Sequence, residues 1–344
     1  MNNLDSTQNN ITAQSLETKS EQYDYIPTSP KISKAQNSRR ITLIDVDTTS
    51  IKTPYEIYAA SAIGGRAENQ DYYSAVETPY GLLLLVCDGM GGANGGATAS
   101  RLAVETIIEK IENSSTDTAP KELLHSVIEH ANTIVHQRSI SEPQLNGMGT
   151  TIVALLLSDH KATVAHVGDS RLYQIRKKRA IFRTFDHSMV FELVRRGSLT
   201  EEEARLSAGS NVILQALGTK SYLDNIEITD NLTYLKGDRF MLCTDGICGA
   251  VPEGKLLELT TSNKSVKLSV DKLMSTINDI GIAAGNEHDN LTAIILEMKG
   301  RSELTPNVKR KSFWIYLVII LALVIVVSSA ALFWYKNNLT SLIE

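Results

Sequence analysis

The sequence predicts an α+β fold, because strand-like and helix-like segments occur in groups and do not alternate strictly along the chain. Apolar runs or apolar–polar alternation, bounded by turn residues, predict seven β-strands. They cover Tyr55–Ile63, Leu82–Cys87, Thr151–Leu157, Ala162–Val167, Arg171–Ile175, Arg239–Cys243 and Leu291–Glu297. Short turns at Ser158–His160 and Gly168–Ser170 separate neighbouring strands, which predicts antiparallel hairpins.

The predicted helices occur mostly in pairs and are identified by apolar residues that recur at three- and four-residue steps. They cover residues 99–111, 124–135, 190–196, 200–207 and 266–284. The fourth opens with Thr200 followed by glutamates, a pattern that is typical of a helix N-cap.

The two ends of the chain differ from its middle. Residues 1–50 are polar and too poor in apolar side chains to bury a core, so we expect them to be disordered. Residues 51–300 form one predicted domain. We then expect a basic juxtamembrane linker over 301–312, a transmembrane helix over 313–335 and a short tail over 336–344.

The transmembrane prediction depends on Phe313–Tyr335, which contains 23 residues without a charge. Trp314 and Trp334 lie near its two ends, as interfacial anchors do. The alternative, a buried globular helix, would have to hide apolar surface on every side. The basic run K-R-K at 309–311 precedes the segment, so the positive-inside rule predicts a cytoplasmic domain that a single pass tethers to the cell membrane. The short linker predicts that the active site stays near the bilayer.

Composition excludes some classes of partner. The net charge of −5 leaves no overall basic face, so we expect no binding of nucleic acid. Cys87, Cys243 and Cys248 lie in or beside apolar runs without C-x-x-C spacing, so we expect reduced core thiols and no zinc site.

The chemistry is carried by four short acidic turns: R-A-E-N-Q-D at 66–71, V-C-D-G-M-G-G at 86–92, T-D-G at 244–246 and H-D-N at 288–290. Asp88 and Asp245 each come after an apolar strand and directly before a glycine. Hard divalent cations take such oxygen ligands, and Mg²⁺ tolerates few of them from protein. Taken singly, each aspartate reads as a turn residue or a helix cap. Together they predict convergence on one cation site.

Other polar residues admit two readings. Arg66 stands five residues before Asp71 and suits bidentate capture of a phosphoryl group, with an ordinary surface arginine as the alternative. Asp169, in V-G-D-S-R, lies between two apolar strands, where it could be a metal ligand or a residue of a hairpin turn. The histidines nearest these motifs are expected to be structural or to support the metal ligands without binding the ion: His166, His187 and His288.

In order along the chain, the motifs R-x-E-N-Q-D, D-G-M-G-G, G-T-T, V-G-D-S-R, D-H-S, A-L-G-T, T-D-G and H-D-N resemble those of the bacterial metal-dependent serine/threonine phosphatases of the protein phosphatase 2C type. The resemblance covers residues 55–298, and residues 186–218 are similar to the flap segment that bacterial members place beside the active site. It implies a four-layer α-β-β-α sandwich of two antiparallel sheets flanked by helices.

The resemblance also implies two bound Mn²⁺ or Mg²⁺ ions, with a third, weaker ion in bacterial members. Arg66 would bind the phosphate, and Asp169 would serve the third ion. The other metal-binding residues that it implies are Asp71, Asp88, Gly89, Asp245 and Asp289.

Four positions depart from the family pattern. Gly249 stands where many members carry a second aspartate, which leaves the third ion without a carboxylate. Gln215 replaces an arginine near the flap, Gln70 replaces an acidic residue, and Met90 replaces a histidine of animal members. None of these changes removes the two-ion core.

The sequence therefore predicts hydrolysis of phosphoserine and phosphothreonine in proteins, by a hydroxide that two metal ions activate. A serine/threonine kinase, or its substrates, is the expected partner. Two alternatives stay open: a catalytically weak, membrane-tethered phosphoprotein-binding regulatory module, and a phosphatase of a partner-switching anti-sigma pathway.

Overall fold

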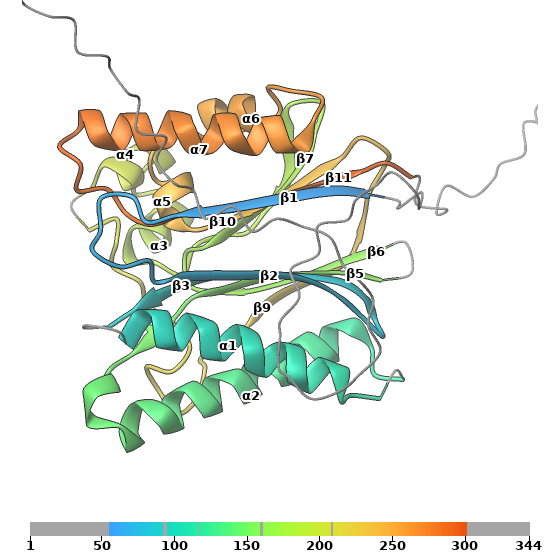
Figure 1. The fold of residues 1–344 in the computed structure, drawn as a ribbon, viewed down its shortest axis with the longest axis vertical. Coiled ribbons are helices and arrows are strands. Elements are labelled where there is room, and N and C mark those ends of the chain that lie inside the picture. The colour runs from blue at the N-terminus through green and yellow to red at the C-terminus, as the bar shows by residue number, and fades with distance from the viewer. Residues whose placement is uncertain (1–54, 92–94, 116, 159–160, 208, 301–344) are drawn as a thin grey trace, which may run out of the picture.

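Two antiparallel sheets stack face to face, with helices on both outer faces, in the computed structural model (Figure 1). The structure describes residues 55–91, 95–115, 117–158, 161–207 and 209–300. The predicted sandwich of two antiparallel sheets flanked by helices is thereby confirmed. The predicted transmembrane segment 313–335 lies outside these residues, and no helix within them is long and apolar enough to cross a membrane.

The first sheet has the strand order β1-β11-β10-β7-β8. Its strands are β1 Tyr55–Ala62, β11 Leu291–Met298, β10 Arg239–Cys243, β7 Arg171–Arg176 and β8 Arg179–Arg183. The second sheet has the order β2-β3-β5-β6-β9, and the short β4 pairs with β3. Its strands are β2 Asp71–Thr78, β3 Gly81–Met90, β4 Gly149–Thr150, β5 Ile152–Ser158, β6 Lys161–Val167 and β9 Glu227–Thr233.

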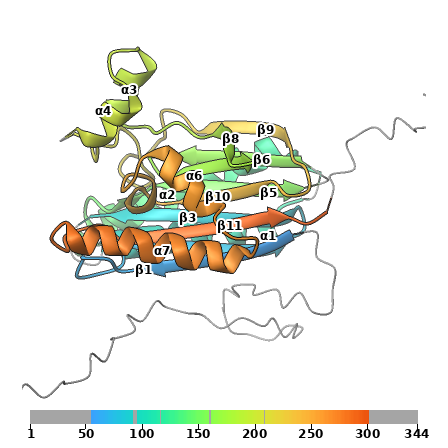
Figure 2. The ribbon, with the colours of Figure 1, turned by 90° about the horizontal axis from the view of Figure 1, so that it is seen from above.

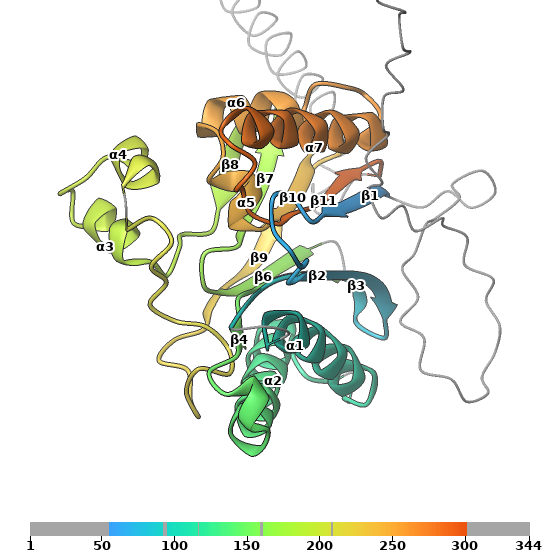
Figure 3. The same cartoon turned by 60° about the vertical axis from the view of Figure 1, so that its left-hand side comes forward.

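The helices form two outer layers and a separate flap. The helices α1 Gly95–Glu112 and α2 Pro120–Ser141 cover the second sheet, and a 3₁₀ turn at Pro143–Leu145 follows them. The first sheet is covered by α5 Asp245–Cys248, α6 Glu253–Thr260 and α7 Val266–Ala283. The flap consists of α3 Met189–Arg195 and α4 Glu201–Leu206, which stand apart from the sandwich (Figures 2 and 3). As predicted, Thr200 caps α4, in a capping box with Glu203.

The central strands are apolar on both faces because each face meets a different layer. In β3, Leu83 and Leu85 pack against α1 and α2, whereas Leu84 and Val86 pack against the other sheet. Such strands read as continuous apolar runs, which is why the sequence located them. The sequence did not predict the two-residue strand β4, nor β2, β8 and β9. The last three all lie at sheet edges and carry more polar residues.

One predicted hairpin is wrong. The turn Gly168–Ser170 joins β6 to β7, and these strands belong to different sheets. Val167 pairs with Ile152 in the second sheet, and Arg171 pairs with Cys243 in the first. Gly168 has a φ of 105°, a conformation that favours glycine, so the chain can turn sharply from one sheet into the other. The turn therefore places Asp169 at the seam between the sheets.

Candidate metal centre

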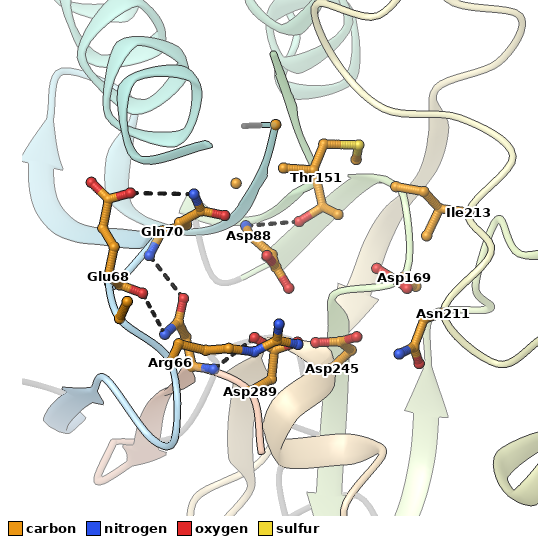
Figure 4. A pocket seen from close by; sticks show the side chains of 15 residues that line it. Arg66, Glu68, Gln70, Asp88, Thr151, Asp169, Asn211, Ile213, Asp245 and Asp289 are labelled. Atoms are coloured by element: carbon orange, nitrogen blue, oxygen red, sulfur yellow. Dashed lines mark hydrogen bonds and ion pairs between the residues drawn. The ribbon is translucent and has the colours of Figure 1, made fainter. Parts of the chain in front are cut away.

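Carboxylates from both sheets meet at one end of the sandwich. Asp71 begins β2 and lies directly opposite Asp88 of β3 in the strand register. Asp245 begins α5 immediately after β10 and Thr244, and Asp289 precedes β11. The four acidic turns of the sequence thus converge, as Figure 4 shows for three of these aspartates.

The convergent residues line a cavity of about 860 Å³. The predicted site residues in its wall are Arg66, Asp88, Gly89, Asp169, Asp245 and Asp289. Asp71 lies beneath them, 7% exposed, where its Oδ2 accepts a hydrogen bond of 3.0 Å from the hydroxyl of Thr244. A second cavity of about 280 Å³ adjoins the first and extends under the flap. The structure therefore brings every predicted site residue into one place.

Burial and mutual repulsion disfavour the charged forms of these carboxyl groups. Burial, followed by the charges of Asp245 and Asp289, raises the pKa of Asp71 to about 7. Burial and neighbouring carboxylates, Asp245 foremost, raise the pKa of Asp88 and Asp169 well above the ordinary value. The pKa of Asp245 is raised by burial and by Asp289. A cation bound among these carboxylates would favour their charged forms and would lower their pKa values.

Two buried carboxylate oxygens provide an independent test of whether cations fit this site. Oδ1 of Asp71 and Oδ1 of Asp245 are buried and have no hydrogen-bond partner among the described residues. An unpartnered buried carboxylate oxygen is costly unless a cation or water satisfies it. The donor set is all oxygen, which suits Mg²⁺ or Mn²⁺. The residues present therefore fit hard divalent cations.

Gly89 is required by close backbone packing beside Asp88. A Cβ at this position would lie 2.1 Å from the carbonyl oxygen of Gly96 and 2.6 Å from that of Gln70. The amide of Gly89 donates to the Gln70 carbonyl at 3.1 Å. The glycine thus lets the start of α1 and the loop before β2 pack against the end of β3, which fixes the position of Asp88.

Arg66 reaches the cluster from the loop between β1 and β2. Its Nη2 lies 2.8 Å from Oδ2 of Asp289, and its side chain is 51% exposed. A half-exposed guanidinium beside the cavity can turn toward a bound anion without breaking a buried contact. Planar, bidentate recognition of phosphate suits arginine.

Several supporting residues were not singled out from the sequence. Asn290 donates from Nδ2 to the carbonyls of Ile63 and Glu68, and its Oδ1 accepts from the amide of Gln70, so it holds the loop that carries Arg66. Asn290 stands in the H-D-N motif, and that motif was the available signal. Other supporting contacts involve Thr244 with Asp71 and the Thr151 hydroxyl with the amide of Asp88 at 2.9 Å, while Asn211 and Ile213 of the flap segment also line the cavity.

The four departures from the family pattern have clear positions. Gly249 ends α5, exposed, and lines the second cavity, where it offers no carboxylate to Asp169. The side chain of Gln215 hydrogen-bonds both the amide and the carbonyl of Asn225. Gln70 contributes backbone contacts to Gly89, and Met90 lines the main cavity.

A second group that could hold a cation consists of His166, His187 and Glu227, whose ligand atoms lie within 4.8 Å of one another. Nδ1 of His187 accepts from the amide of Gly168 at 3.3 Å, so its proton lies on Nε2, which faces Glu227 at 3.5 Å. A cation on that Nε2 would require the proton to move to Nδ1, where Gly168 already donates. Nε2 of His166 is engaged with the Phe185 carbonyl at 2.8 Å. We therefore read this group as a brace for the turn that carries Asp169.

In this two-sheet sandwich, carboxylates meet at the strand ends beside an arginine. The fold and the site together define a class of protein that is suited to metal-dependent hydrolysis of phosphate esters. The sequence profile of the protein phosphatase 2C family matches residues 60–285, and the chain belongs to that family. The enzyme class predicted from the sequence, a protein-serine/threonine phosphatase, is confirmed.

Named relatives agree with this assignment. The serine/threonine phosphatase stp of Listeria monocytogenes is 32% identical over 246 residues, which cover 69% of this chain and 91% of that protein. The solved serine/threonine phosphatase Stp1 from Staphylococcus aureus superposes with a TM-score of 0.64 at 26% identity, covering 77% of this chain and all of that one. The catalytic domain of the phosphatase PstP, solved with two manganese ions, superposes with a TM-score of 0.59 at 28% identity, covering 71% and 97%.

Proposed function

We propose that this chain hydrolyses phosphoserine and phosphothreonine in proteins, with two Mn²⁺ or Mg²⁺ ions held by the carboxylates at the seam of the sandwich. The observation that carries the proposal is the pair of unpartnered buried oxygens on Asp71 and Asp245, inside a cavity that Arg66 borders. The two manganese ions of the related PstP domain support this choice of metal. Proteins phosphorylated by a serine/threonine kinase, or the kinase itself, are the proposed substrates.

The ligand roles follow from position. Asp88, the Gly89 carbonyl, Asp245 and Asp289 would hold the two ions, and Asp71 would support them from below. Divalent cations at this place would activate water as the nucleophile and neutralise charge on the phosphoryl oxygens. Asp169 lies near Asp245 but has no carboxylate partner at Gly249, so a third ion would bind weakly.

The protein's own groups would bind and orient the phosphate. Arg66 would exchange its contact with Asp289 for two hydrogen bonds to phosphoryl oxygens, since Asp289 would then face a cation. Asn290 would keep the Arg66 loop in place. Preorganised charge of this kind stabilises a transition state more than flexible charge does.

Hydrolysis of p-nitrophenyl phosphate and of a phosphothreonine peptide by residues 51–300, with and without Mn²⁺, tests the proposal. We expect metal-dependent turnover that Asp88→Asn reduces by at least 100-fold, together with weaker Mn²⁺ binding in calorimetry. Calorimetry keeps the metal assignment testable where activity is lost for another reason. Turnover in the presence of a chelator, or an unchanged Mn²⁺ affinity in the variant, would contradict the assignment.

We also propose that residues 313–335 anchor the chain in the cell membrane with the phosphatase domain in the cytoplasm, on the basis of the uncharged 23-residue run and the basic residues before it. The full chain should then resist extraction from membranes by alkaline carbonate, and residues 51–300 should be recovered in the soluble fraction. Release of the full chain by carbonate would exclude the anchor.

A further inference from the structure

The turn between β7 and β8 carries four consecutive basic residues, Arg176 to Arg179. Lys177 and Lys178 form its tip, both exposed, with φ values of 49° and 66°. A two-residue hairpin turn of this shape favours Asn-Gly and similar pairs, because both central residues need a positive φ. Turn propensity therefore does not explain lysine at either position, and a strained conformation of this kind is a reason to look for a function.

Further cations are exposed on the same end of the molecule. Lys236 lies in the turn between β9 and β10, and Lys264 lies in the loop between α6 and α7. Asp238 lies in the same turn as Lys236 and forms an ion pair of 2.6 Å with Arg176. The β9–β10 turn is therefore adjacent to the β7–β8 turn. The buried Arg239, at the start of β10, donates hydrogen bonds to the carbonyls of Asn263 and Lys264. These bonds hold the α6–α7 loop beside the β9–β10 turn. We call the exposed cations Lys177, Lys178, Arg179, Lys236 and Lys264 the basic end.

The basic end has unbalanced positive charge. None of its five members forms an ion pair with another described residue. Of the carboxylates near these turns, Asp238 pairs with Arg176, Glu297 with Arg239 and Lys299, and Glu56 with Lys299. Glu77 accepts a hydrogen bond from Tyr55 and forms no ion pair with a described residue. The three turns therefore carry an excess of positive charge, although the whole chain carries −5.

The chain leaves the domain beside these cations. The amide of Gly237 donates to the Met298 carbonyl at 2.8 Å, and the Met298 amide donates to the Asp238 carbonyl at 2.9 Å. Met298 is the last residue of β11, and residues 299–312, which extend at most about 50 Å, separate it from the uncharged segment 313–335. The basic end is thus the part of the domain that the proposed anchor would keep closest to the bilayer.

The metal centre lies at the opposite end. Asp289 precedes β11 and Met298 ends it, and this strand has 8 residues, which at about 3.3 Å per residue span roughly 25 Å. In Figure 1 the end of β11 lies on the right, whereas α5, which begins with Asp245, lies on the left.

From these positions we infer that the basic end docks on anionic phospholipid headgroups, so that the metal centre opens away from the membrane. The inference rests on the proposed membrane attachment. It places the metal centre on the side of the domain away from the bilayer, whereas the short linker alone predicted an active site near the bilayer. Each basic residue near an anionic surface strengthens binding by about fivefold. The five cations together can therefore hold one orientation of a tethered domain without forming any specific contact.

Vesicle sedimentation tests the docking without the anchor. The solved relatives consist of this domain alone, since the match covers 97–100% of those chains, so residues 51–300 are a suitable unit. We expect them to bind vesicles that contain 40% phosphatidylglycerol and not vesicles of phosphatidylcholine. Lys177→Asn/Lys178→Gly, which retains a favourable turn, should weaken binding by about 25-fold. The matched control, Lys255→Gln/Lys272→Gln, removes two exposed charges from α6 and α7 and should change binding by less than twofold.

The full chain in lipid nanodiscs tests the orientation. Amide hydrogen exchange at residues 176–179 should slow in anionic discs relative to neutral ones, whereas exchange in the flap should not change. Equal vesicle binding by the turn variant and the control would overturn the docking surface. So would stronger binding of DNA than of anionic vesicles at the same salt concentration, because the partner would then be a nucleic acid. Carbonate extraction and phosphatase turnover are measured on the same proteins, so a failure of the anchor or of the enzyme is recognised separately.

Discussion

Asp71→Asn should stabilise the metal-free protein and weaken its binding of metal. The pKa of Asp71 is about 7 in the folded protein and 3.8 is its ordinary value. At about 1.4 kcal/mol per pH unit, ionising this group in the folded state costs on the order of 4 kcal/mol above pH 7. Asparagine has no charge and its carbonyl can still accept the hydrogen bond from Thr244.

The sign of the pH dependence follows from proton binding. The folded state binds the Asp71 proton more tightly than the unfolded state does, so stability falls as pH rises from about 4 to about 7 and is then level. Between pH 5.5 and pH 8 the loss through Asp71 alone is about 2 kcal/mol. Asp88, Asp169 and Asp245 have pKa values raised in the same direction, so they add to this slope.

Urea unfolding in excess chelator at pH 5.5 and pH 8 measures this effect. We expect the wild-type protein to be more stable at pH 5.5, and Asp71→Asn to reduce the difference by about 2 kcal/mol. Asp279→Asn, which removes an exposed carboxylate from α7, is the control and should leave the difference unchanged. A wild-type protein that is more stable at pH 8 without metal, or an Asp71→Asn variant that keeps the full slope, would refute the electrostatic reasoning.

Three other substitutions probe the site and the core. Arg66→Ala should lower kcat/KM for a phosphopeptide by about 10- to 100-fold, as expected for the loss of a charge-assisted contact, and Arg66→Lys should recover part of that loss in steady-state assays. Gly89→Ala should reduce the free energy of unfolding in urea by about 3 kcal/mol or more, because the new Cβ would lie 2.1 Å from the Gly96 carbonyl oxygen. The control is Gly254→Ala in α6, where a Cβ would meet no atom within 4 Å, and it should not destabilise the protein. Leu84→Ala, in the layer between the sheets, should cost about 2–5 kcal/mol, and a melting temperature equal to that of wild type would contradict the packing described here.

Local signals located the central strands and the acidic turns, and these were enough to predict the class of fold. Leu82–Cys87 and Leu291–Glu297 are apolar on both faces, and an aspartate at the end of a strand is visible in the sequence. The edge strand Glu227–Thr233 carries charged and polar residues and lacks that signal. The sheet to which a strand belongs is also invisible locally, which is why the turn at Gly168 was expected to close a hairpin.

The residues that hold the site in place were harder to predict because their partners are distant in sequence. Thr244 and Asp71 are separated by 173 positions, and Asn290 and Gln70 by 220. Neither hydrophobic periodicity nor motif spacing in the sequence predicts such a contact, because it depends on how the two sheets pack together. A site of this kind can be predicted by its ligands, but its supporting hydrogen bonds become visible only in three dimensions.

The metal centre lies on the seam of the sandwich, and this position links cation binding to folding. Asp71 and Asp88 come from one sheet, whereas Asp245 and Asp289 adjoin strands of the other, so the donor set exists only when the sheets are packed together. A ligand present at about 1,000 times its Kd stabilises the folded state by about 4 kcal/mol. That is comparable to the cost of ionising Asp71 in the metal-free fold. Bound cations would therefore offset the repulsion that the carboxylates introduce, and the same charges that make the metal-free protein sensitive to pH would make the loaded protein resistant to unfolding.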